Sequence, residues 1–64
     1  MGAKKLKDAM SQSETTINLL LGARTVAKSK NDTYLVDLIN QTIDLLEDTL
    51  LTIENRLEDN DVSN

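Results

Sequence analysis

Apolar residues in the second half of the chain recur at alternating steps of three and four, from Val36 to Leu57. Such steps place every member on one side of an α-helix, with the 3.5-residue period of a coiled coil. The pattern predicts a helix over about residues 33–58, with Asp32 or Thr33 as its N-cap. The main seam of this helix is Val36, Ile39, Ile43, Leu46, Leu50, Ile53 and Leu57.

The first half is also periodic, but two neighbouring registers fit it. One register has the larger apolar groups and includes Arg24, whereas the other has small residues that would let a second helix approach closely. The pattern does not choose between them. The first register is Leu6, Met10, Ser13, Ile17, Leu20, Arg24 and Ala27. The second register is Ala9, Ser13, Thr16, Leu20, Ala23 and Ala27.

Two starts fit the first helix. Ser11 and Glu14 match a capping box that would begin the helix at residue 12, whereas Leu6 already keeps helical spacing. We predict a helix over about residues 5–29, with its start lying between residues 3 and 12. The turn-forming residues at about 30–32 then separate the two helices. The acidic, aperiodic residues 59–64 are predicted to form a flexible tail.

The charge distribution favours an antiparallel hairpin. Residues 1–31 carry six basic and two acidic side chains, a net charge of +4, whereas residues 32–64 carry one basic and nine acidic side chains, a net charge of −8. Folding one half against the other aligns opposite charges. The predicted fold class is therefore all-α, an antiparallel two-helix hairpin that forms a single small domain.

Several leucines of the predicted hairpin lie outside its seams. A chain of 64 residues buries only about 60% of its unfolded surface, and without Cys or His it has no disulfide or usual zinc site to stabilise it. Pairing of two hairpins into a homodimeric four-helix bundle would bury the extra apolar groups. The predicted oligomer or partner interface consists of Leu19, Val26, Leu35, Leu38, Leu45 and Leu51.

The composition disfavours catalysis and cofactor chemistry. Without His or Cys, the Ser and Thr residues have no base placed to activate them, and a two-helix hairpin offers no closed pocket for a carboxyl general acid. We therefore expect no enzymatic activity, no cofactor and no bound metal. Because the chain also has no long apolar run and no signal-peptide core, we expect a cytoplasmic protein that does not enter a membrane.

Two kinds of partner fit these features. An acidic helical surface beside an apolar stripe is typical of protein-binding regulators or adaptors, which is the expected function of this helical oligomer. The alternative is a dimeric RNA- or DNA-binding regulator that uses the basic first helix. Overall acidity and a single aromatic residue, Tyr34, count against this alternative. Its candidate phosphate contacts are Lys4, Lys5, Lys7, Arg24, Lys28 and Lys30.

The predicted layout resembles that of the Rop family of plasmid copy-control proteins. Both have a short chain made of a helix, a tight turn, a heptad helix and an acidic tail, and the resemblance implies a four-helix dimer. It covers nearly the whole chain, but as architecture only. Proteins of that family bind RNA through amide and basic side chains around a phenylalanine of the first helix. The first helix here carries Lys7, Gln12, Asn18 and Lys28, but the chain has no Phe.

Overall fold

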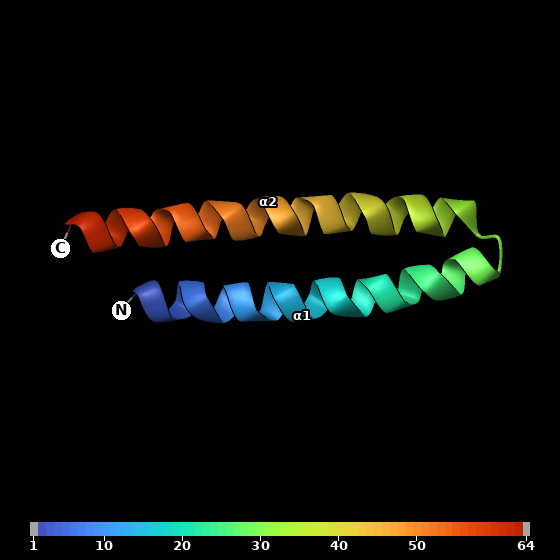
Figure 1. Cartoon of the computed structure of the whole chain (residues 1–64), viewed down its shortest axis with the longest axis horizontal. Helices are drawn as coiled ribbons and strands as arrows, with labels where there is room; N and C mark the ends of the chain where they lie inside the picture. Colours follow the sequence, from blue (N-terminus) through green and yellow to red (C-terminus); the bar gives the residue numbers. More distant parts are fainter. Residues whose placement is uncertain (1, 64) are drawn as a thin grey trace.

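A computed structural model describes the backbone of residues 2–63 and the side chains of residues 2–59. Two helices, α1 (Gly2–Ser29) and α2 (Thr33–Ser63), lie side by side and run in opposite directions (Figure 1). The predicted all-α hairpin is confirmed. Its overall extents are 51 × 14 × 11 Å, so the molecule is a rod that is one helix thick.

The first helix ends in a Schellman motif. The N–H of Asn31 donates to the carbonyl of Lys28 at 3.1 Å, and the N–H of Asp32 donates to the carbonyl of Ala27 at 3.0 Å. Asn31 has a φ of 58°, the left-handed conformation that this motif requires. Asn tolerates that conformation better than other residues with a side chain, which explains why the turn falls here.

The second helix begins directly after this motif with a side-chain cap. A carboxylate oxygen of Asp32 accepts the N–H of Leu35 at 3.2 Å, and the Asp32 carbonyl accepts the N–H of Val36 at 3.1 Å. Asp32 is therefore the N-cap, as one of the two sequence alternatives predicted. Because the same residue also completes the Schellman motif, the connection between the helices needs only three residues.

The hairpin packs through the main seam of α2 and the first of the two registers of α1. All residues of both sets are buried or half-buried, whereas Ala9 and Ala23 of the second register are exposed. The most buried side chains are Ala27, Ile39 and Ile43, which are 2%, 5% and 7% exposed. The core is thus thin and is deepest near the turn.

Both outer ends of the helices differ from the prediction. The first helix begins at Gly2 rather than near residue 5, so Ser11 is an interior residue whose carbonyl accepts the Thr15 hydroxyl, and the capping-box reading was wrong. The second helix continues to Ser63, where a flexible tail over 59–64 was expected. Residues 59–63 contain no Pro or Gly to interrupt the backbone hydrogen bonds of the helix. Asn64 lies outside the described residues.

The rod exposes more surface than a compact chain of its mass. Its accessible surface is 5001 Å², whereas the scaling for compact monomers predicts about 4,100 Å² for this mass. The radius of gyration is 15.0 Å, against roughly 11 Å for a compact domain of this length. The excess of about 900 Å² is close to the roughly 800 Å² that each partner buries in a standard protein interface.

Candidate interaction surface

The residues beside the packed seam differ sharply between its two sides. One step along an α-helix turns by about 100°, so the residues immediately before the seam positions form one side and those immediately after form the other. In an antiparallel pair of helices, a two-fold axis perpendicular to the plane of the two helices relates the seam positions of one helix to those of the other. The residues that precede the seam positions in α1 and in α2 therefore lie on the same face of the hairpin. The residues that follow the seam positions lie on the opposite face.

The face made by the preceding residues has no charged side chain along its central length, and we call it the uncharged face. From α1 it contains Ala9, Gln12, Thr16, Leu19, Ala23 and Val26. From α2 it contains Leu35, Leu38, Thr42, Leu45, Thr49 and Thr52. Charged residues border it only at its ends. These are Lys30 beside the turn, and Lys5, Arg56 and Asp59 at the open end.

Five of the six predicted interface residues gather on the uncharged face. Leu19 and Leu45 are 70% and 69% exposed, and Val26, Leu35 and Leu38 are also exposed. Two of these five residues come from α1, and α2 contributes three leucines. The second register of α1, which competed with the first in the sequence, supplies Ala9, Thr16 and Ala23 to this face.

The sixth predicted interface residue, Leu51, lies on the opposite face. We call this surface the charged face, because its α2 side is mainly acidic. Leu51 is 61% exposed and lies among carboxylates on α2, and Leu21 of α1 is 37% exposed on the same face. The acidic residues that accompany Leu51 on the following side of α2 are Asp37, Asp44, Glu47, Glu54 and Glu58.

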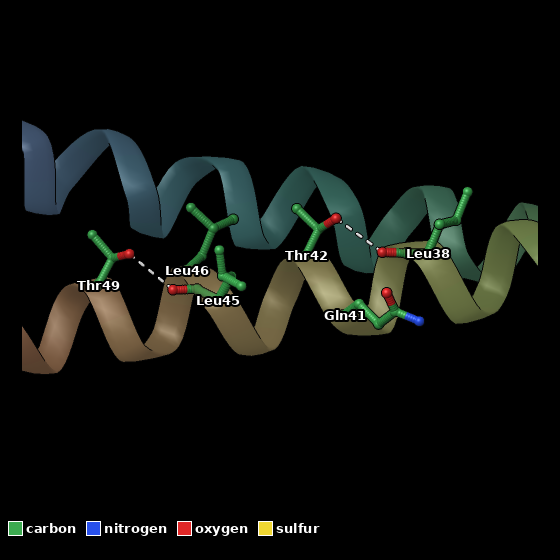
Figure 2. Close-up of a pocket in the computed structure, with 6 residues that line it drawn as sticks. All are labelled: Leu38, Gln41, Thr42, Leu45, Leu46 and Thr49. Atoms are coloured by element: carbon green, nitrogen blue, oxygen red, sulfur yellow. Dashed lines mark hydrogen bonds between the residues drawn. The ribbon is translucent and has the colours of Figure 1, made fainter.

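An open groove runs along the α2 side of the uncharged face (Figure 2). It has a volume of about 320 Å³ and is lined by Leu38, Gln41, Thr42, Leu45, Leu46 and Thr49. The hydroxyl of Thr42 donates to the Leu38 carbonyl at 2.9 Å, and that of Thr49 donates to the Leu45 carbonyl at 2.8 Å. Burying a hydroxyl is costly when its hydrogen bond is lost, but these bonds lie within α2 itself. A partner can therefore cover both threonines without leaving a donor unpaired.

The basic residues of α1 and the turn do not form one surface. Arg24 lies half-buried in the seam, where its Nη1 donates to the Asn40 side-chain oxygen at 2.8 Å. Lys4 pairs with Asp8 of the same helix at 3.2 Å, and both side chains are well exposed. The other lysines are exposed in two groups. Lys5 and Lys7 lie at the open end, and Lys28 and Lys30 lie at the turn end.

The contact between Arg24 and Asn40 was not predicted, because a cationic residue at a seam position gives no sign of which partner accepts its hydrogen bonds. It sets the antiparallel register, and equal steps along the two helices from this contact bring Lys5 level with Asp59. Among the residues with described side chains, no ion pair joins α1 to α2. The opposite charges of the two halves therefore align without pairing directly.

Over the described residues, no three carboxylates gather closely enough to hold a metal ion, and neither helix has the length of apolar sequence needed to cross a membrane. Comparisons of the chain with protein-family models, curated protein sequences and solved structures find no match. The two faces of the hairpin are therefore the candidate functional surfaces of the protein.

Proposed function

We propose that the protein is a non-enzymatic helical homodimer that acts as a protein-binding regulator or adaptor. In this proposal two hairpins pair through their uncharged faces into a four-helix bundle. The charged faces then stay outside and bind a partner protein.

The observation that carries the dimer is the exposed apolar surface of the uncharged face. Burying one Leu side chain completely contributes about 1.5–3 kcal/mol, and three leucines of α2 lie on this face in each copy. The hairpin has few fully buried side chains of its own, so this gain is large relative to its stability. The excess surface of about 900 Å² is the amount that a standard interface would cover.

The support for a protein partner comes from the charged face. Its acidic side chains favour a basic partner and steer its approach, whereas Leu51 offers an apolar contact that the dimer does not use.

The nucleic-acid alternative has less support. Arg24 is held in the seam by Asn40, and the remaining lysines are divided between the two ends of a rod 51 Å long. Tyr34, the one aromatic residue of the chain, is available for stacking but stands alone. Electrophoretic mobility shifts with mixed RNA and DNA at low salt would support this alternative if binding were tight and weakened steeply with salt.

Two measurements test the proposal. Sedimentation equilibrium at micromolar concentration should give twice the 7.1 kDa mass of one chain. Affinity capture from the native host should then recover a protein with the wild type that is lost with Leu51→Gln, a variant that should still form the dimer. A monomer would refute the assembly, and equal capture by both proteins would refute the role of the charged face.

A further inference from the structure

We infer that the two copies pair with their turns at the same end, so that α1 of each copy packs against α2 of the other. This inference rests on the proposed dimer and adds its geometry. Two-fold symmetry allows only two ways to place one uncharged face on another with the helices aligned. An axis parallel to the helices gives the same-end arrangement, and an axis across them gives the opposite-end arrangement, in which each helix packs against its own copy.

The apolar groups of the uncharged face favour the same-end arrangement. Equal steps along the helices from the contact of Arg24 with Asn40 bring Leu19 level with Leu45, and Val26 level with Leu38. An axis parallel to the helices keeps these levels, so the same-end dimer sets Leu19 and Val26 of one copy against Leu45 and Leu38 of the other. The same register brings Gln12 level with Thr52, so polar groups also face polar groups.

Charge favours the same arrangement independently. The same-end dimer places each half of net charge +4 beside the −8 half of the other copy, whereas the opposite-end dimer places the two −8 halves side by side. Among the residues with described side chains, no ion pair joins α1 to α2, and the ion pair of Lys4 with Asp8 lies within α1. The opposite net charges of the two halves therefore attract each other across the dimer without direct pairing inside one hairpin.

The charged residues at the ends of the uncharged face also favour the same-end arrangement. Lys5 is level with Asp59 in the register of the hairpin, so the same-end dimer brings Lys5 of each copy over Asp59 of the other. The opposite-end dimer instead brings Lys5 towards Lys30 of the other copy, and both are cations. Opposite charges meet in the first case, and like charges meet in the second.

The orientation of the dimer also decides whether its basic residues can form one surface for a nucleic acid. In the same-end dimer the two α1 helices lie at diagonal corners of the bundle, so their lysines cannot form one continuous basic surface. In the opposite-end dimer the two α1 helices are neighbours and would form such a surface. The orientation of the dimer therefore separates the protein-binding function from the nucleic-acid alternative.

Pulsed electron double resonance on spin-labelled full-length protein tests the orientation. The chain has no Cys, so Ser29→Cys carries a single label on the exposed outer side of α1 beside the turn. The same-end dimer should give a distance of about 30 Å between the labels, because the two α1 helices lie at diagonal corners, about 11–14 Å apart for helix spacings of 8–10 Å, and both labels project outwards. The opposite-end dimer should give a distance beyond about 40 Å, because the turns are then separated along the bundle at 1.5 Å per residue.

Asn18→Cys provides the matched control, since it is exposed near the middle of α1 and reports a dimer in either arrangement. A short distance at both sites supports the same-end dimer. A short distance at Asn18→Cys with a long one at Ser29→Cys overturns the inference but leaves the proposed dimer intact. No dipolar coupling at either site overturns both.

Discussion

Replacing Leu45 by Gln should separate association from folding. Leu45 is 69% exposed in the hairpin, so the substitution removes little packing within one chain. In the proposed dimer the exposed part of this side chain becomes buried. If complete burial of a Leu is worth about 1.5–3 kcal/mol, covering this fraction contributes about 1–2 kcal/mol per copy and about 2–4 kcal/mol per dimer. The dissociation constant should therefore rise about 30- to 700-fold.

Leu51→Gln is the matched control, because Leu51 is 61% exposed but lies on the charged face. Sedimentation equilibrium over a concentration series gives the dissociation constant of each variant. Far-UV circular dichroism at protein concentrations above the dissociation constant shows whether the helices still form. Only Leu45→Gln should weaken the dimer, and both variants should stay helical. Equal dissociation constants for the two variants would refute the assignment of the interface to the uncharged face.

Substitutions at five further positions test the turn, the first helix and the two charged ends of the proposed interface. Asn31→Ala should lower the free energy of unfolding by about 1 kcal/mol because of the left-handed backbone, whereas Asn31→Gly should not lower it, as measured by urea denaturation. Asp32→Ala should cost about 1 kcal/mol in the same assay through loss of the N-cap, and Asp32→Asn should keep most of it. Gly22→Ala should raise the free energy of unfolding by about 0.5–1 kcal/mol, since an added Cβ meets no atom within 4 Å; a decrease would mean that another group packs there. Lys5→Glu should raise the dissociation constant by up to about fivefold, and Asp59→Lys in the same chain should restore it; tighter association of Lys5→Glu alone would contradict the same-end pairing.

Most of the structure of α2 could be predicted from the sequence. Its seam residues are all large and apolar, and Asp32 lies at the helix boundary with the right chemistry for a cap. Both signals are local, because helical periodicity and capping depend on residues within one or two turns of each other. The outer ends of both helices could not be located from the sequence, because polar residues without Pro or Gly are compatible with a helix or a loop.

The register of α1 required the tertiary structure. Ser13 and Arg24 are weak seam residues, so two registers were equally plausible from the sequence. Packing against α2 decided between them, because only in the first register do the large side chains of Leu6, Met10 and Ile17 meet the partner helix. Arg24 is tolerated there because Asn40 accepts its hydrogen bond.

The sequence by itself determined that the chain forms two helices, that they pair, and that several leucines are left over. It could not determine on which side of the hairpin these leucines lie, because a face made by two helices depends on their relative rotation and direction. The antiparallel packing placed Leu38 and Leu45 of α2 on the same face as Leu19 and Val26 of α1, and it separated Leu51 from them. The extra leucines are thereby divided between the uncharged face, for which a second copy is the proposed partner, and the charged face, for which a different protein is proposed.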